Sequence, residues 1–579
     1  MVWADRALAG KLGPAERAAN AARVAGGSFD VVVIGGGVVG TGVALDAVTR
    51  GLSVALFESR DIASGTSSRS SKLFHGGLRY LEMLEFGLVR EALAERELML
   101  TTLCPHLARP VSFLYPLKTR LVERPYVEVG LQLYDRLGGA RSVPRHRQLT
   151  RAGALRLCPA LKKEALIGGV HYFDGQVDDA RHTLTVARTA AGYGAVIQPS
   201  TQVVGFLREA DRVAGVRVRD VETGVESAVS AGVVVNATGV WTDELQHLAG
   251  SRGRFRVRAS KGVHLVVPRD RIPSETGLIL RTETSVLFVI PWKSHWIIGT
   301  TDTDWNLDLA HPAATSADIE YLLTQVNSVL VTPITLEDIE GVYAGLRPLL
   351  AGESESTSKL SREHAVARVA PGLVAIAGGK YTTYRVMAAD AVDMAAEELP
   401  GRINPSCTRQ VPLLGADGYH ALVNQTDQLA AASGVHPYRI KHLLGRYGSA
   451  IHEVLALAET DRSLLSPLPG APDYLEVEAL YAVTHEGALH VEDVLARRTR
   501  ISIEYSNRGT EAVGRVAELM APVLGWSSDQ TATEVASYLA RVDAERRSQI
   551  EPDDASADEV RLHAPDIRGR LTESAASPA

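Results

Sequence analysis

Three glycines and one carboxylate near the start of the chain have the spacing of a site that holds a dinucleotide. Gly35, Gly37 and Gly40 lie in the stretch DVVVIGGGVVGTGVALDAVTRGLSVALFE, which ends at Glu58. Glycines in a tight turn let the backbone approach a pyrophosphate, and the next helix offers free N–H groups and the positive end of its dipole. An acid at the end of the second strand accepts hydrogen bonds from an adenosine ribose. A lone glycine motif also occurs in ordinary turns, but here strand, turn, helix, second strand and acid all stand at the expected spacing.

A polar stretch that follows directly is the second candidate for chemistry. Residues 59–82, SRDIASGTSSRSSKLFHGGLRYLE, contain five hydroxyl side chains between Thr66 and Ser71. Four further polar side chains follow them: Lys72, His75, Arg79 and Tyr80. So close to the glycine turn, such a loop is predicted to wrap a ligand, with a solvated loop as the alternative.

Later stretches predict the elements that must position these groups. Residues 373–385, LVAIAGGKYTTYR, repeat the order of strand, glycine turn and helix, and we expect the helix N-terminus near Thr382 to face the cofactor. Residues 233–239, VVVNATG, form a strand and a turn of small residues. Residues 261–268, 285–292 and 295–301 are β-like, and Lys293 with Ser294 joins the last two as a hairpin. These segments fit an antiparallel sheet inserted into the nucleotide-binding fold, where it caps the cofactor and builds the substrate pocket.

The composition is that of a globular protein of several domains. The chain has 579 residues, enough for two or three domains, with 45% hydrophobic and 22% charged residues. Its net charge of −7 argues against general nucleic-acid binding. Three cysteines lie far apart, which excludes a disulfide framework and a CxxC pair, and no His and carboxylate cluster has metal-ligand spacing.

Membrane contact, if the protein makes any, is expected to be peripheral. Residues 1–27 lack the continuous apolar core of a signal peptide. The apolar window 31–48 contains five glycines and Asp46 and breaks at a turn, so we reject it as a membrane span. Residues 126–137 have the pattern of an amphipathic helix, for which a core-facing role is favoured over a membrane-surface role.

In order and approximate spacing, these motifs resemble those of the FAD-dependent, respiratory glycerol-3-phosphate dehydrogenases. The shared sequences are the glycine stretch, TSSRSSKLFHGGLRYLE, GQVDDAR, NATGVW, KGVHLVVP, VIPW with IIGTTD, GLRPL and GGKYTTYR. The resemblance covers residues 30–385 and continues more weakly into HEGALHVEDVLARRTRI. It implies an α/β FAD-binding domain of the glutathione-reductase, Rossmann type, with an inserted antiparallel β-rich cap domain and a helical C-terminal domain.

The expected division of the chain combines this resemblance with the local patterns. It is as follows: 1–28, an exposed N-terminal extension; 29–110, 171–255 and 345–400, three parts of the FAD-binding domain; 111–170 and 256–344, two parts of the cap and substrate domain; 405–525, the helical domain; and 548–579, a disordered acidic tail. The extension and the tail lie outside the core of the family.

The resemblance also implies FAD as the cofactor, held without a covalent bond; a histidyl flavin link at His75 is the alternative. The three glycines of the turn and Glu58 serve the ADP half. The residues expected at the isoalloxazine, ribityl and pyrimidine regions are Ser70, Ser71, Lys72, Gly379, Lys380 and Thr383. His75 is expected either to orient the loop or to help in proton removal.

The implied reaction is oxidation of sn-glycerol 3-phosphate to dihydroxyacetone phosphate, with hydride transfer to FAD. Arg79 and Arg347 are the candidates for the phosphate, because permanently charged, bidentate arginines suit a dianion, and Tyr80 adds a hydrogen bond. His264 is the candidate base, since an imidazole titrates near working pH; a structural histidine is the alternative. Lys380 is expected to polarise the developing carbonyl or to contact flavin or phosphate, with helix capping as its alternative.

The resemblance further implies that electrons pass to a membrane quinone, in a dimeric protein that is peripheral on the cytoplasmic face of the cell membrane. A glycerol-3-phosphate oxidase, which gives electrons to oxygen, is the nearest alternative, and the motifs separate the two poorly. An amine or amino-acid oxidase would lack the basic residues Arg79, Arg347 and Lys380. A flavin-binding adaptor without catalysis would show no flavin reduction by the substrate.

Overall fold

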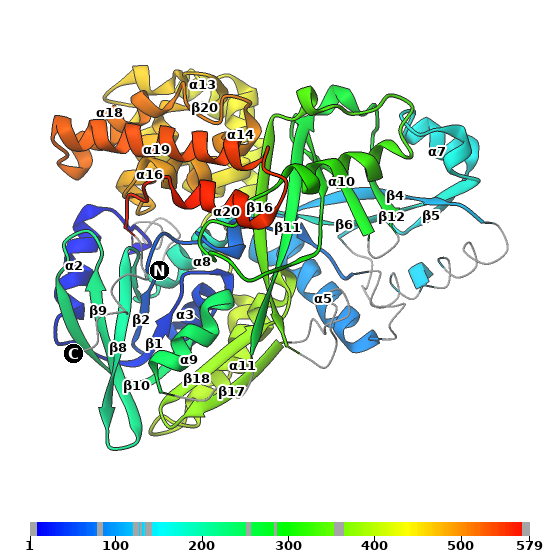
Figure 1. Cartoon of the computed structure of the whole chain (residues 1–579). Coiled ribbons are helices and arrows are strands. Elements are labelled where there is room, and N and C mark those ends of the chain that lie inside the picture. The colour runs from blue at the N-terminus through cyan, green and yellow to red at the C-terminus, as the bar shows by residue number, and fades with distance from the viewer. Residues whose placement is uncertain are drawn as a thin grey trace.

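The computed structural model describes residues 9–77, 85–119, 127, 130–132, 134, 142–250, 256–282, 286–351 and 364–569. Three parts are visible in Figure 1: a parallel sheet with its helices at the lower left, a β-rich part that extends to the right, and a helical part above the parallel sheet. This is the predicted fold class.

Parallel strands with buried β-branched side chains form the centre of the first sheet. Their order is β18 (Leu373–Gly378), β10 (Glu226–Asn236), β1 (Ser28–Ile34), β2 (Val54–Phe57) and β7 (Val196–Gln198). Antiparallel strands β8 (Thr201–Glu209), β9 (Arg212–Asp220) and β17 (His364–Ala370) complete the sheet.

Both faces of this sheet are covered, as expected for a parallel sheet. Val31 and Val33 of β1 belong to a core shared with three helices: α3 (Val38–Thr49), α8 (Asp179–Gly192) and α11 (Tyr384–Ala396). Val32 faces the other way and packs in a core with side chains of β8, β9 and β10. The helix α2 (Pro14–Val24) lies at the edge of this part, beside β7.

The second sheet is largely antiparallel. Its strands run in the order β15 (Thr303–Trp305), β11 (Val257–Pro268), β14 (His295–Gly299), β13 (Val286–Trp292), β12 (Gly277–Arg281), β4 (Arg109–Leu117), β6 (Gly168–Gln176) and β3 (Leu73–Phe74), with β16 (Gly341–Leu350) paired to β11 and β5 (Arg147–Thr150) paired to β6. The predicted hairpin through Lys293 is β13–β14. Only the β4–β12 pair departs from the predicted antiparallel arrangement among the described strands, because its two strands run parallel.

Side-chain alternation gives this sheet two cores. Leu265 of β11 packs towards α10 (Ser316–Asn327), whereas the next residue, Val266, packs on the opposite face with Trp292. The same side also contacts Ile503 of the helical part. Helix α7 (Arg151–Leu157) lies at the outer end of the β-rich part, whereas α5 (Phe86–Leu98) lies nearer to the parallel sheet and contacts the turn Tyr381–Thr383 (Figure 1).

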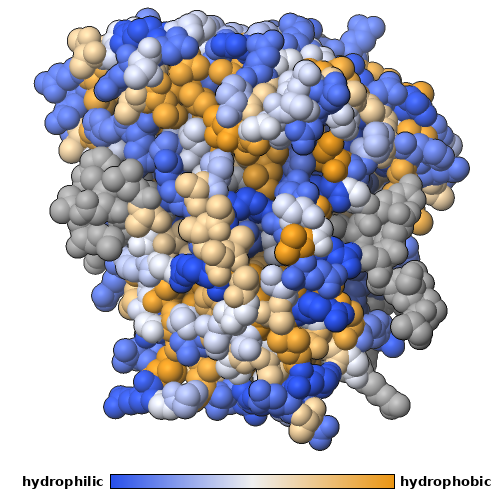
Figure 2. All heavy atoms as spheres, turned by 90° about the vertical axis from the view of Figure 1, so that its left-hand side faces the viewer, coloured by the Kyte–Doolittle hydropathy of each residue, from blue (hydrophilic) through white to orange (hydrophobic). Residues whose placement is uncertain are grey.

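The helical part contains α12 (Tyr419–Asn424), α13 (Thr426–Ser433), α14 (Pro437–Tyr447), α15 (Ile451–Leu457), α16 (Glu476–His485), α17 (Ile501–Glu504), α18 (Val513–Leu524), α19 (Ser528–Ser548) and α20 (Asp554–Leu562). Of the described helices, none is long and apolar enough to cross a membrane. Figure 2 shows apolar areas separated by charged ones on the face at the left of Figure 1.

The prediction of a disordered tail from residue 548 was wrong for residues 549–569. This segment contains α20, and Ala557 on that helix is fully buried beside Val240 and Trp305. Arg568 is also buried, with its guanidinium 2.8 Å from a carboxylate oxygen of Asp493. The polar composition of this segment predicted exposure to solvent. The structure instead pairs charged side chains of the segment with residues far away in the sequence.

Candidate active site

The glycine turn has the tight geometry that the sequence pattern requires. Gly35 has a φ of +108°, and a Cβ there would lie 2.7 Å from the carbonyl oxygen of Ala237. At Gly40 a Cβ would lie 2.0 Å from the carbonyl oxygen of Gly35, so this residue lets α3 pack against the turn. Gly35 and Gly37 line a cavity, whereas Gly40 supports the turn from behind.

Glu58 directly follows β2 and lies on the wall of the same cavity. One carboxylate oxygen accepts a hydrogen bond from the amide of Gly36 at 2.7 Å, and the other accepts one from the amide of Arg60 at 2.8 Å. Burial raises the pKa of this carboxyl, and the two amides oppose that shift. Glu58 therefore fixes the turn and presents its remaining acceptor positions to a ligand.

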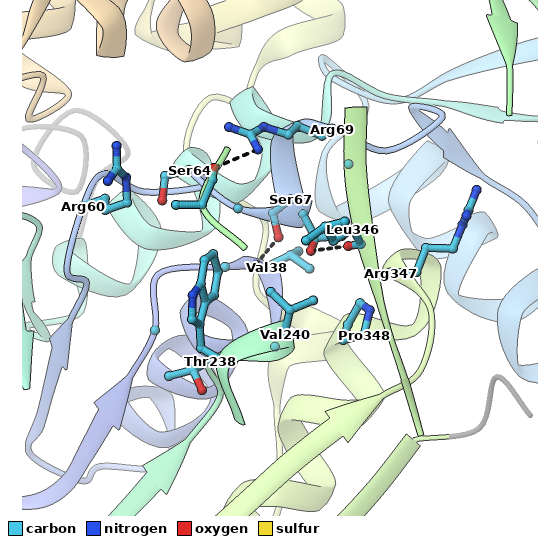
Figure 3. Close-up of a pocket in the computed structure, with 18 of the residues that line it drawn as sticks. Val38, Arg60, Ser64, Ser67, Arg69, Thr238, Val240, Leu346, Arg347 and Pro348 are labelled. Carbon is cyan, nitrogen blue, oxygen red and sulfur yellow. Dashed lines mark hydrogen bonds between the residues drawn. The ribbon is translucent and has the colours of Figure 1, made fainter. Parts of the chain in front are cut away.

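The cavity has a volume of about 870 Å³ and extends from the glycine turn to the second sheet. Figure 3 shows how residues from the two sheets face each other across it, with Thr238 and Val240 on one side and Leu346 and Arg347 on the other. The polar loop lies between them: Ser67 accepts a hydrogen bond from the amide of Val38 at 2.9 Å. Loop, parallel sheet and β-rich sheet thus enclose one space.

His264 lies on β11 at the inner end of this cavity. Its ring stacks on Tyr343 of β16 with 4.7 Å between centroids, and its Nε2 is 2.8 Å from the hydroxyl of Ser71. Nδ1 is buried and has no hydrogen-bond partner among the described residues. Burial, with the nearby charges of Arg347 and Lys72, holds the pKa of His264 well below its usual range. The imidazole is therefore neutral near pH 7 and able to accept a proton.

Arg347 lies on β16, on the wall of the cavity. It donates to the hydroxyl of Thr300 at 3.0 Å and to the carbonyl of Thr301 at 3.2 Å, and it lies 3.5 Å from Asp302. The carboxylate was not expected, and it orients the guanidinium while partly offsetting its charge. The side chain remains 19% exposed and is accessible from the cavity.

The predicted Gly-Gly turn brings β18 and α11 to the cavity. Gly379 and Lys380 line it, and Lys380 is the N-cap residue of a short helical turn, Tyr381–Thr383. Thr382 lines the cavity, whereas its neighbour Thr383 does not, although both are buried; the hydroxyl of Thr383 donates to the carbonyl of Lys380 at 3.4 Å. A contact between Thr383 and the flavin stays a prediction.

The loop residues predicted to contact the flavin have different surroundings. Ser70 and Ser71 line the cavity. Lys72 does not line the cavity: it has a φ of +57°, is fully buried, and places its Nζ 2.9 Å from Asp179 and 3.1 Å from the carbonyl of Ser68. Asp179 also accepts hydrogen bonds from the amide and hydroxyl of Ser70. Lys72 therefore fixes the loop from behind.

Of the remaining predicted residues, His75 lines the cavity, and its amide donates to the hydroxyl of Thr382 at 3.1 Å. Arg79 and Tyr80, predicted to bind phosphate, lie outside the described residues, as does most of the predicted amphipathic helix 126–137. The described part of the chain holds no group of three or more His, Cys, Asp or Glu residues that could bind a metal ion.

A buried set of ion pairs behind the polar loop was missed. Arg497 and Arg498 pair with Asp61, and Arg500 pairs with Asp178 and Asp179. We call these six residues the arginine clamp. It fixes the helical part onto the loop that carries Ser70 and Ser71. The motifs GQVDDAR and ARRTR were visible in the sequence, but nothing local showed that they pair.

A second missed feature is the C-terminal wall of the cavity. Residues 561–566 and Gly569 line it, together with Arg541 of α19 and with Arg60 and Arg69 of the loop. The carboxylate of Asp566 lies 2.6 Å from Arg60 and 2.8 Å from Nε2 of His311. These contacts hold the segment over the cavity.

The family models that match the chain describe an FAD-dependent oxidoreductase, over residues 30–385, and the C-terminal domain of alpha-glycerophosphate oxidase, over residues 406–531. The chain is 68% identical to glycerol-3-phosphate dehydrogenase 2 of Mycobacterium tuberculosis, over 98% of this chain and 97% of that protein. It is 36% identical to the mitochondrial glycerol-3-phosphate dehydrogenase of Homo sapiens, over 86% of this chain and 71% of that protein. A crystal structure of glycerol-3-phosphate dehydrogenase from Bacillus halodurans complexed with FAD superposes with a TM-score of 0.77, at 29% identity, over 92% of this chain and 98% of that one.

Proposed function

Because the chain belongs to the FAD-dependent glycerol-3-phosphate dehydrogenase family, we propose that it oxidises sn-glycerol 3-phosphate to dihydroxyacetone phosphate and passes the electrons to a membrane quinone. One observation of the structure carries the proposal: a single cavity joins the dinucleotide turn and Glu58 to His264 and Arg347. Cofactor-binding groups and groups suited to a hydroxyl and a phosphate thus share one space.

The residues of the cavity fit FAD. Its volume of about 870 Å³ is within the range of cofactor sites. Gly35 and Gly37 leave the backbone accessible at the start of α3, and Glu58 offers acceptors for the ribose. Ser70, Ser71 and Lys380 line the same cavity, and we propose that they contact the isoalloxazine and ribityl regions. When bound, FAD supplies the acceptor for the hydride from C2 of the substrate.

His264 is proposed to take the proton of the C2 hydroxyl at Nδ1. In the tautomer that carries its proton on Nε2, the imidazole donates a hydrogen bond to the hydroxyl of Ser71. Nδ1 is then the nitrogen that can accept a proton. Nδ1 has no hydrogen-bond partner among the described residues, so it is the ring nitrogen proposed to accept the proton. The hydroxyl proton goes to His264 as the hydride leaves C2, so the alcohol becomes a ketone.

Arg347 is proposed to bind the phosphate of the substrate, with Lys380, which lines the same cavity, and Arg79 and Tyr80 as further predicted contacts. The hydrogen bonds of Arg347 to Thr300 and Thr301 fix its orientation before the substrate arrives. Two cations that line one cavity suit a dianion, which an amino-acid substrate would not need.

Attachment to the cytoplasmic membrane surface and a homodimer are proposed on the resemblance to the family. Flotation with liposomes tests the first, and analytical ultracentrifugation tests the second. A protein that stays in the dense fraction, or that sediments as a monomer at micromolar concentration, would contradict the respective proposal.

A second candidate is an oxidase, because residues 406–531 match a model named after alpha-glycerophosphate oxidase. We would mix the purified protein with sn-glycerol 3-phosphate without oxygen, follow the flavin absorbance, and then add either a quinone analogue or oxygen. The proposal expects bleaching, fast recovery with the quinone and slow recovery with oxygen. Fast recovery with oxygen would make the protein an oxidase, and no bleaching would exclude this substrate and leave the amino-acid oxidases or a non-catalytic adaptor.

A further inference from the structure

Four arginines line the cavity near the C-terminal segment. Arg60 and Arg69 come from the polar loop, Arg541 comes from α19, and Arg561 comes from α20. We call these four residues the cation cluster. Burial, together with the repulsion of Arg561 and other neighbouring arginines, lowers the pKa of both Arg69 and Arg541 to about 10. The four side chains are therefore close enough to repel one another.

Two members of the cluster, Arg69 and Arg541, form no ion pair with a described residue, although the negative charge of Glu492 acts on both. Arg60 pairs with Asp566 at 2.6 Å, and Arg561 lies 3.3 Å from Glu545. By contrast, Arg541 forms no hydrogen bond or ion pair with any described residue, although it is only 8% exposed. Arg69 donates to the carbonyl of Ala310 at 3.1 Å and has no ion pair within the described chain. Buried charges without partners are costly, so this arrangement is typical of a site whose partner is an anionic ligand.

The segment that brings Arg541 and Arg561 to the cavity is anchored on all three parts of the molecule. Asp566 binds Arg60 of the polar loop and His311 of the β-rich part. Asp554 pairs with Lys261 on β11. Arg568 donates to the hydroxyl of Ser200 at 2.8 Å and pairs with Asp493. With these anchors, the segment is held in place across the cavity mouth.

We propose that residues 541–569 form part of the cofactor site, in which Arg541 and Arg69 supply positive charge to the diphosphate of FAD and the segment from Arg561 to Gly569 retains the cofactor. The cluster lines the same cavity as Gly37 at the start of α3 and Ser67. Figure 3 shows Arg60, Ser64 and Arg69 around the same cavity as Ser67 and Val38. A diphosphate bound at the start of α3 would thus lie in the field of the cluster.

This part of the site is an addition to what the family models cover, since the second match ends at residue 531. Helix α19 continues to Ser548, and α20 follows it. The inference depends on FAD as the cofactor and not on the identity of the substrate. Measuring FAD release therefore tests the role of residues 541–569 in holding FAD independently of whether the proposed reaction is correct.

A free anion is the other ligand that this charge could attract. A second, smaller cavity of about 110 Å³ lies behind the first and shares Arg69, Arg541, Arg561 and His311 with it. Its volume would admit a single phosphate but no dinucleotide. The diphosphate is favoured because the cluster also faces the larger cavity, where the glycine turn already provides a place for it.

The test replaces Arg541 by Gln and compares it with Arg547→Gln on the same helix, where the side chain is 60% exposed. FAD release from the holoenzyme is followed by the rise in flavin fluorescence after dilution, and binding of ADP and of riboflavin to the apoprotein is measured by calorimetry. We expect Arg541→Gln to release FAD about tenfold faster or more and to bind ADP correspondingly more weakly, with riboflavin binding unchanged. Arg547→Gln should match the wild type.

Asp566→Asn provides an independent test if Arg541→Gln does not fold, because it loosens the anchor and keeps the cation. It should release FAD several-fold faster, with the helical content unchanged by circular dichroism. Unchanged FAD release in the folded variants would overturn the proposal. So would stabilisation of the holoenzyme by inorganic phosphate that depends on Arg541 while FAD release does not.

Discussion

The arginine clamp and the cavity bury the same kinds of side chain but differ in how these are paired. In the clamp, Arg498 and Arg500 are almost inaccessible, and each lies within 2.8 Å of at least one carboxylate. In the cavity, Arg541 has no carboxylate partner among the described residues, and Nδ1 of His264 has no hydrogen-bond partner there. Paired charges hold the helical part on the loop, whereas groups that both lack a partner and line the cavity are the ones proposed to contact a ligand. Pairing and position together therefore separate the two roles, which burial alone does not.

The largest effect, on the rate of flavin reduction, is expected from a substitution of His264 in the cavity. Replacing His264 by Gln removes the base and keeps a side chain that can face Ser71. We expect anaerobic flavin reduction by sn-glycerol 3-phosphate to slow ~10²–10⁴-fold with FAD content unchanged, as measured by stopped-flow absorbance. In the wild type, the depressed pKa of His264 keeps the base deprotonated, so the rate should stay nearly constant from pH 8 to pH 6.5. A variant rate close to that of the wild type would exclude His264 as the base.

Breaking the clamp should affect stability instead. Asp61→Asn leaves Arg497 and Arg498 without the carboxylate that they share, and we expect the free energy of unfolding to fall by about 3–5 kcal/mol in urea denaturation. Asp543→Asn is the matched control, because its pair with Arg547 is exposed at 65% and 60% and should contribute less than about 1 kcal/mol. Equal losses in the two variants would mean that burial of the pair does not matter.

A smaller effect, which depends on pH, is expected at a paired histidine. His490 lies between Glu222 and Glu534 at 3.1 and 2.7 Å. Burial and Arg568 disfavour the charged ring, but the two carboxylates outweigh them and raise the pKa of His490 to about 9. A raised pKa contributes stability that is complete below about pH 6.5 and is lost as the pH rises through 9.

The size of this pH effect should be about 2–3 kcal/mol in the free energy of unfolding, measured between pH 6.5 and pH 9.5. His490→Gln should be less stable than the wild type at pH 6.5, and the difference should shrink towards pH 9.5. A constant difference over this range would show that His490 is not charged in the folded protein.

Local sequence patterns predicted the strands, turns and helices that carry the site. They could not predict features that depend on pairing between residues far apart in the sequence. The turn at Gly35 and the one at Gly379 were predicted because glycine spacing and apolar runs are local signals. The surroundings of Lys72 were not, because a positive φ turns it away from the cavity towards Asp179, far along the chain. The sequence did not predict that residues 549–569 are structured, for the same reason: the residues that pair with Arg568 and Asp566 lie in other domains.

The position of the C-terminal segment has a consequence for how the protein is made. The glycine turn at Gly35 leaves the ribosome long before Arg541 and Asp566, by on the order of a minute at ~5–20 residues per second. Until then, the side of the cavity that residues 561–569 will cover is open to solvent. Flavin loading should therefore be easiest on a growing or newly released chain, and a cell short of FAD during synthesis would accumulate protein whose last segment has closed over an empty site.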